Sequence, residues 1–98
     1  MKVRNTMSEI KRKHLRFFGS VQGVGFRYRA RHAAGLLGVT GWVRNEYDGS
    51  VTMEIQGTQE EIDQVVAMIG QGRYVRIDGI DARTIPLVED ETGFRSGR

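Results

Sequence analysis

Apolar residues change their spacing along this 98-residue chain, and the order of those changes restricts the fold more than any other feature. Helical spacing, with apolar residues three or four apart, runs from Phe26 to Leu37 and again from Ile62 to Ile69. Strand-like stretches cover residues 14–21, 40–46, 50–56 and 74–83. The expected order of elements is therefore strand, helix, strand, strand, helix, strand.

Local signals mark where several of these elements meet. Gly38 stands where a left-handed cap would end the first helix. Tyr47-Asp48-Gly49 is typical of a hairpin turn between the two middle strands. Thr58 and Glu61 have the spacing of a capping box at the start of the second helix. The strand before that helix alternates, so one of its faces is expected to be buried through Val51, Met53 and Ile55.

Two strand–helix–strand units joined in this order predict an α+β fold, the ferredoxin-like βαββαβ sandwich. Its antiparallel sheet carries two helices on one face, and right-handed crossovers place the third strand beside the first. A short extended segment near Phe94 is expected to close the sheet. We expect a single domain over residues 13–98, preceded by a flexible basic leader over residues 1–12, which show no apolar period. Because many activities share this fold, the fold alone does not indicate a function.

Composition excludes several classes of protein. The absence of cysteine excludes disulfides, thiolate metal sites and a cysteine nucleophile. Hydrophobic residues at 39% and charged residues at 28% are typical of a globular domain rather than a disordered chain. No apolar run is long enough to span a bilayer, and the first residues lack the apolar segment of a secretion signal. We therefore expect a cytoplasmic protein that makes no membrane contact.

The net charge of +3 is concentrated near the N-terminus. Six of the 15 Lys and Arg residues lie among the first 16 positions, and the rest of the chain is slightly acidic. A basic leader is usually solvated, so nucleic-acid binding is the less favoured interpretation. An RNA-binding module of this fold would also carry an aromatic signature on its third strand, which the segment SVTMEIQ lacks.

The link between the first strand and the first helix, GSVQGVG over residues 19–25, is rich in glycine. Glycines let successive N–H groups point inward, and a helix start adds unpaired N–H groups and partial positive charge. Such a geometry binds anions, and Arg27 in the first helical turn would add a planar cation that matches phosphate oxygens. The spacing fits neither a Walker-type loop nor the dinucleotide fingerprint. Without further information, a tight turn and a surface arginine explain these residues equally well.

Two motifs resemble those of a known family. GSVQGVGFR, residues 19–27, resembles the acylphosphatase signature G-x-V-Q-G-V-x-F-R. GWVRNEYDGSV, residues 41–51, is similar to the second signature of that family, G-W-V-x-N-x-x-D-G-x-V. Gly57, the second helix and the late segment ETGFR also resemble the family pattern, so the likeness covers about residues 14–95. The resemblance implies an enzyme that hydrolyses acyl phosphates to a carboxylate and inorganic phosphate.

The resemblance also implies the site residues. Arg27 and the N–H groups of the phosphate-binding loop would hold the phosphate, and Asn45 would orient the attacking water. The loop residues are Gln22, Gly23, Val24, Gly25 and Phe26. Val24 and Phe26 are expected to anchor the loop in the core. An acyl phosphate is already activated, so placing the water and neutralising charge would suffice, with the proton passing to the substrate's own phosphate. Inorganic phosphate is expected to inhibit as the product.

The remaining polar residues offer no other chemistry. His14 and His32 belong to neither motif, and the acidic residues lack metal-ligand spacing, so we expect no metal and no cofactor. Trp42 is more typical of a packed residue than of a substrate contact. Arg29 and Arg44 are either steering charges or exposed ones. We expect a monomer and a free-standing enzyme, although the same module also occurs as the front domain of larger carbamoyl-transferring maturation proteins.

Overall fold

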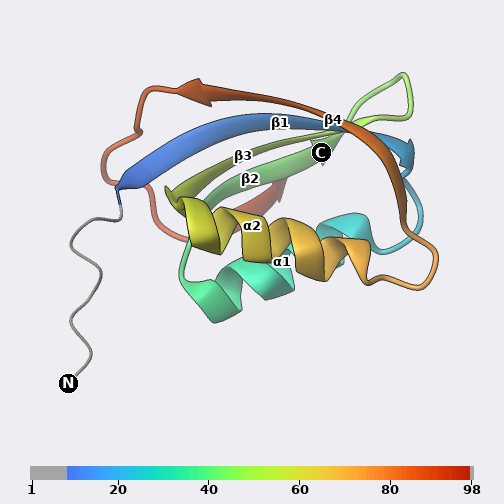
Figure 1. The fold of residues 1–98 in the computed structure, drawn as a ribbon, viewed down its shortest axis with the longest axis horizontal. Coiled ribbons are helices and arrows are strands. Elements are labelled where there is room, and N and C mark those ends of the chain that lie inside the picture. The colour runs from blue at the N-terminus through green and yellow to red at the C-terminus, as the bar shows by residue number, and fades with distance from the viewer. Residues whose placement is uncertain (1–8, 98) are drawn as a thin grey trace.

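The computed structural model describes residues 9–97, which form one sheet with two helices on one of its faces (Figure 1). The elements are β1 (Ile10–Ser20), α1 (Phe26–Leu37), β2 (Thr40–Asn45), β3 (Val51–Thr58), α2 (Gln59–Gly70), β4 (Arg76–Ile85) and β5 (Phe94–Gly97). The strands lie in the order β4-β1-β3-β2-β5, so the third strand pairs with the first as expected. The ferredoxin-like α+β fold is confirmed. None of the helices in residues 9–97 is long and apolar enough to cross a membrane.

The expectation of a purely antiparallel sheet is wrong at one edge. β5 closes the sheet as expected, but it pairs with β2 in parallel, with Gly41 opposite Phe94. The reason is the path of the chain, because β4 lies at the opposite edge of the sheet. Residues 86–93 cross the sheet past Gln56, whose side chain bonds both the N–H and the carbonyl of Val88. After this crossing the chain runs in the same direction as β2.

The first strand begins earlier than the sequence pattern indicates. Residues 10–12, which the pattern assigns to the leader, belong to β1. Arg12 is only 2% exposed, and its guanidinium bonds Glu54 at 3.2 Å and Glu91 at 2.8 Å. These two carboxylates neutralise a cation that would otherwise keep this segment in solvent. Residues 1–8 of the expected leader lie outside the described residues.

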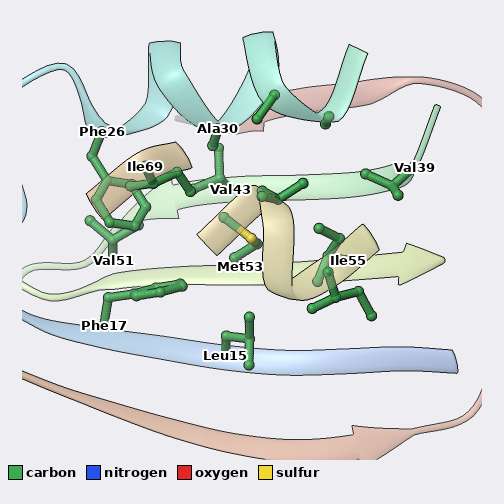
Figure 2. Packing of buried hydrophobic residues seen from close by; sticks show 14 of the residues in the cluster. Leu15, Phe17, Phe26, Ala30, Val39, Val43, Val51, Met53, Ile55 and Ile69 are labelled. Atoms are coloured by element: carbon green, nitrogen blue, oxygen red, sulfur yellow. The ribbon is translucent and has the colours of Figure 1, made fainter. Parts of the chain in front are cut away.

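The core lies between the helices and the face of the sheet that they cover (Figure 2). The predicted alternation of β3 is confirmed, because its inward side chains Val51, Met53 and Ile55 are all fully buried. Phe17 of β1 and Phe26 of α1 meet edge to face, with 4.9 Å between ring centroids. This contact holds the start of α1 against the end of β1, where the glycine-rich link lies.

Both helices end or begin as their local signals predict. Gly38 has a φ of 72°, and its N–H bonds the carbonyl of Ala34 at 2.8 Å to close α1. At the start of α2, the Thr58 hydroxyl accepts from the N–H of Glu61, and the Glu61 carboxylate accepts from the N–H of Thr58. Glu60 and Glu61 add negative charge to this end of α2.

Candidate active site

The loop over residues 21–25 joins β1 to α1 in a conformation that glycine permits. Gly23 and Gly25 have φ values of 72° and 86°, in the left-handed region. A Cβ at either position would meet no atom within 4 Å. Backbone conformation rather than crowding therefore requires glycine at both positions, and the space beside them is open.

The loop is fixed to the core at both ends. Val21 is 1% exposed and Phe26 is 2% exposed, and both belong to the main hydrophobic cluster. Val24, between Gly23 and Gly25, packs against the same cluster. Val24 and Phe26 thus anchor the loop as expected, and the backbone N–H groups between them have a defined position.

The start of α1 has the properties of an anion site, in contrast to the start of α2. No side chain caps α1, and no acidic residue lies in its first turn. The N–H of Arg29 bonds the carbonyl of Gly25 at 3.0 Å, which is the first bond of the helix. The N–H groups of Phe26, Arg27 and Tyr28 precede that bond and point out of the helix end. A helix start without a carboxylate of its own favours an anion from outside.

Arg27 lies in a cavity of about 360 Å³ beside this loop. Its guanidinium donates to the hydroxyl of Ser96 in β5 at 3.5 Å. The described residues that line the cavity are Val21, Gly23, Gly25, Phe26, Arg27, Tyr28, Arg31, Asn45 and Ser96. None of these described residues is acidic, and the guanidinium groups of Arg27 and Arg31 border the cavity together with the helix start.

Asn45 lines the same cavity from the opposite side. It is the last residue of β2, and strand alternation places it on the same face as buried Val43, towards α1. It also borders a neighbouring hollow of about 390 Å³ that is lined by Gln22, Glu46 and Tyr47. Within residues 9–97 the Asn45 carboxamide makes no hydrogen bond. The fold therefore brings the two residues of the two motifs together, with an amide available to a ligand or a water.

Gln22 contributes its side chain to the site, a role that the sequence leaves undefined. Its carboxamide donates to the carbonyl of Glu46 at 2.7 Å and to the carbonyl of Ser50 at 2.8 Å. These two carbonyls belong to the hairpin that follows Asn45. One side chain thus links the loop over residues 21–25 to the hairpin that follows Asn45.

The predicted Asp-Gly hairpin is present and supports Asn45 rather than joining the site. Gly49 has a φ of 93°. The Asp48 carboxylate accepts from the hydroxyl of Ser50 at 2.6 Å and from its N–H at 2.9 Å, and it also pairs with Arg16. These hydrogen bonds from Ser50, with the charge of Arg16, lower the pKa of Asp48. Asp48 therefore remains ionised and holds the turn.

Other residues weighed from the sequence lie outside the cavity. Trp42 points to the opposite face of the sheet from Val43, and the Arg44 guanidinium covers its ring at 4.9 Å. Arg29 does not line the cavity. His14 bonds Glu54 at 2.8 Å, and His32 stacks on Tyr28. Among residues 9–97 no group of three His, Asp or Glu side chains could hold a metal ion.

Sequence reasoning missed four residues that line the cavity, one of them Val21 at the start of the loop. Ser96 reaches it only because β5 pairs with β2, which no local pattern indicates. Tyr28 and Arg31 belong to α1, and Arg31 follows Arg27 by four residues. Because residues four apart share a face of a helix, the spacing of Arg27 and Arg31 could have identified Arg31 as a lining residue.

These features define a class of protein, a small α+β domain with a candidate anion site where a glycine loop meets a helix start. A model of the acylphosphatase family matches residues 13–96, nearly all of this domain. The chain belongs to the acylphosphatase family, enzymes that hydrolyse acyl phosphates.

Known relatives agree with this assignment over nearly their whole length. The acylphosphatase of Salinibacter ruber is 40% identical over 89 residues, which cover 90% of this chain and 94% of the relative. The crystal structure of acylphosphatase from Bacillus subtilis has a TM-score of 0.81 and 25% identity, covering 92% of this chain and all of the other. The acylphosphatase from Coxiella burnetii has a TM-score of 0.79 and 29% identity, covering 94% and 99%.

Proposed function

We propose that the chain hydrolyses acyl phosphates in the cavity shared by Arg27 and Asn45. The N–H groups of residues 22–26 and the Arg27 guanidinium hold the phosphoryl group, and Asn45 orients the attacking water. One observation carries this assignment: both side chains line one cavity beside a helix start that no side chain caps, and none of its lining residues within 9–97 is acidic.

The chemistry needs few groups because the substrate is a mixed anhydride. The water oxygen attacks phosphorus, the bond from phosphorus to the acyl oxygen breaks, and a carboxylate leaves. The proton of the water passes to a phosphoryl oxygen. Negative charge on the phosphoryl oxygens is stabilised by N–H donors and a guanidinium that are already in position. The Asn45 carboxamide can accept from the water through Oδ1 and donate to a phosphoryl oxygen through Nδ2.

A neutral residue suits the position of Asn45. A carboxylate there would repel the phosphate, and a cation would compete with water for the phosphoryl oxygens. Gln22 links the loop that precedes Arg27 to the hairpin that follows Asn45. The water and the phosphoryl group therefore meet in a fixed orientation. Neither a metal nor a cofactor has a part in this scheme.

We also propose that the protein acts as a monomer in the cytoplasm and that inorganic phosphate inhibits competitively. Both motifs that supply the proposed site lie in this one sequence, so the proposed scheme requires no residue from a second copy. A chain without cysteine suits a reducing compartment. Phosphate fits because it is the product and carries the group that the loop binds.

The ion pairs on the helix-free face of the sheet argue against RNA binding, the alternative function. Three arginines on or beside this face are each paired with a carboxylate: Arg12 with Glu91, Arg16 with Asp48, and Arg44 with Glu46. Pairing within the protein removes the cations that would contact RNA phosphates.

The test is hydrolysis of benzoyl phosphate in the presence of EDTA. We expect full wild-type activity, and competitive inhibition by inorganic phosphate. A wild-type protein that is folded but inactive on benzoyl phosphate, with or without EDTA, contradicts the proposed function. Activity that EDTA removes and Mg²⁺ restores contradicts only the metal-free scheme.

A further inference from the structure

Arg31, a second arginine, lines the same cavity as Arg27, the residue proposed to bind phosphate. Arg31 lies on the same face of α1 as Arg27, roughly 6 Å further along the helix axis, and lines the same cavity. Within residues 9–97, the Arg31 side chain makes no hydrogen bond or ion pair. In this respect it differs from Arg12, Arg16 and Arg44, each of which pairs with a carboxylate.

The position of Arg31 relative to Asn45 follows from chain direction. α1 and β2 are joined by two residues and run in opposite directions, so the end of β2 lies near the start of α1. Asn45 is at that end, level with Arg27, whereas Arg31 lies one helical turn further away. The cavity therefore extends from Asn45 past Arg27 towards Arg31.

Phosphoryl transfer determines which end of the cavity receives the acyl group. The attacking and leaving oxygens lie roughly in line on opposite sides of phosphorus. If Asn45 orients the water, the acyl oxygen leaves on the side away from Asn45. That side is the part of the cavity that Arg31 lines.

The hollow on the other side of Asn45 is unsuited to an anionic acyl group. Glu46 lines it, and hydrogen bonds from Thr52 and Arg44 lower the pKa of Glu46, so its carboxylate is ionised at neutral pH. An anion there would meet a negative charge, whereas an anion near Arg31 would meet a positive one.

We propose that Arg31 binds a second anionic group on the acyl part of the substrate. The site then favours acyl phosphates that carry a carboxylate or phosphate about two carbons beyond the carbonyl, which is within reach of a cation roughly 6 Å from Arg27. Arg31 is thus a specificity residue for the acyl group. This inference rests on the proposed function and deepens it.

The test compares succinyl phosphate with butanoyl phosphate, which have four-carbon acyl groups that differ by a carboxylate in place of a methyl. Initial rates are corrected for spontaneous hydrolysis. We expect the wild-type KM for succinyl phosphate to be about tenfold lower than that for butanoyl phosphate. Arg31→Gln should remove this difference by raising the KM for succinyl phosphate much more than the KM for butanoyl phosphate.

Arg83→Gln is the matched control, because it removes an exposed charge from β4 and should preserve the difference. Equal wild-type KM values for the two substrates would overturn the inference and leave the proposed function intact. The same would follow if Arg31→Gln raised both KM values by one factor, since Arg31 would then act only on the shared phosphate. A wild type that hydrolyses neither substrate would instead contradict the proposed function itself.

Discussion

The carboxamide of Gln22 donates a 2.7 Å hydrogen bond to the backbone carbonyl of Glu46, the residue that follows Asn45. With the second bond to Ser50, one side chain joins the loop over residues 21–25 to the hairpin that follows Asn45. The two halves of the site come from separate motifs, so their separation depends on this contact. We therefore expect Gln22 to act as a positioning residue whose effect on the rate is exerted through Asn45.

Replacing Gln22 with alanine should reduce kcat by roughly tenfold or more, because a small displacement of an aligned water lowers the rate strongly. The inhibition constant of inorganic phosphate should change much less, since the loop N–H groups remain. Gln56→Ala is the matched control, because it too removes two side-chain bonds to the backbone, in this case to the N–H and the carbonyl of Val88. If both variants lose kcat equally, Gln22 has no special role in the site.

Asn45→Ala should reduce kcat for benzoyl phosphate by roughly 100- to 1,000-fold, the range seen when one aligned polar group is removed from a transition state. The phosphate inhibition constant should stay close to that of the wild type, because Asn45 is assigned to the water. Asn45→Asp should weaken phosphate binding as well, by charge repulsion. Steady-state kinetics with phosphate as inhibitor distinguishes these effects, and retention of wild-type kcat in Asn45→Ala would refute the assignment.

Arg27→Lys should raise both the KM and the phosphate inhibition constant about tenfold or more, because an ammonium cannot reproduce the paired donors of the guanidinium. Arg29→Lys is its control, being on the same helix but outside the cavity. Equal effects of the two substitutions would show that only the overall positive charge of α1 matters. The measurement is competitive inhibition by phosphate at fixed ionic strength.

Gly25→Ala and Gly35→Ala should change stability in opposite directions. At Gly25, where φ is 86°, a side chain costs about 1–2 kcal/mol of folding free energy and should also weaken phosphate binding. At Gly35, inside α1 with open space beside it, alanine should stabilise by about 0.5–1 kcal/mol. Urea unfolding measures both, and a Gly25→Ala variant as stable as the wild type would contradict the conformation given for the loop.

The buried contact between Arg12 and Glu91 should make the free energy of unfolding depend on pH under acidic conditions. Burial alone raises the pKa of Glu91, but hydrogen bonds from Arg12 and Thr40 outweigh it and lower the pKa below the usual value. A carboxylate with a lowered pKa in the folded state stabilises the protein above its unfolded pKa of about 4.3, and this contribution disappears as the pH falls through the folded pKa. We expect the free energy of unfolding to fall below about pH 4.5.

Two variants test this acid dependence. Glu91→Gln should be less stable than the wild type at pH 7 and should lose less stability on acidification. Asp78→Asn is the control, because Asp78 pairs with Arg76 at an exposed position and should alter the pH profile little. Arg12→Ala should cost about 3 kcal/mol, since it leaves two carboxylates without their buried partner. Identical pH profiles for wild type and Glu91→Gln would rule out this contribution.

Features that depend on neighbours in the chain could be predicted from the sequence. The caps at Gly38 and Thr58, the Asp-Gly turn and the alternation of β3 are all determined within a few residues, and all are confirmed. The glycine loop with Arg27 belongs to the same group, because a strand, a loop and a helix start follow one another directly.

Features that depend on distant residues could not be predicted in this way. Arg12 lies in a run of cations that resembles a solvated leader, and only Glu54 and Glu91, far along the chain, bring it into the sheet. The parallel pairing of β5 depends on a crossing that has no local pattern. Asn45 was indicated by the family resemblance alone, because a strand-end asparagine has no distinguishing local signal. The bonds of Gln22 likewise join segments that only the fold brings together.

The strand order β4-β1-β3-β2-β5 has a consequence for how quickly this small domain can fold. β1 is flanked by β3 and β4, whose nearest residues lie tens of positions further along the chain. Closing such long loops costs chain entropy before any of these pairings can stabilise the molecule. Refolding is therefore expected to take about milliseconds to seconds, rather than the microseconds that helical bundles of similar size require. The two edge strands, β4 and β5, pair with segments that lie further away along the chain than those paired in the middle of the sheet, so the edges close the longest loops.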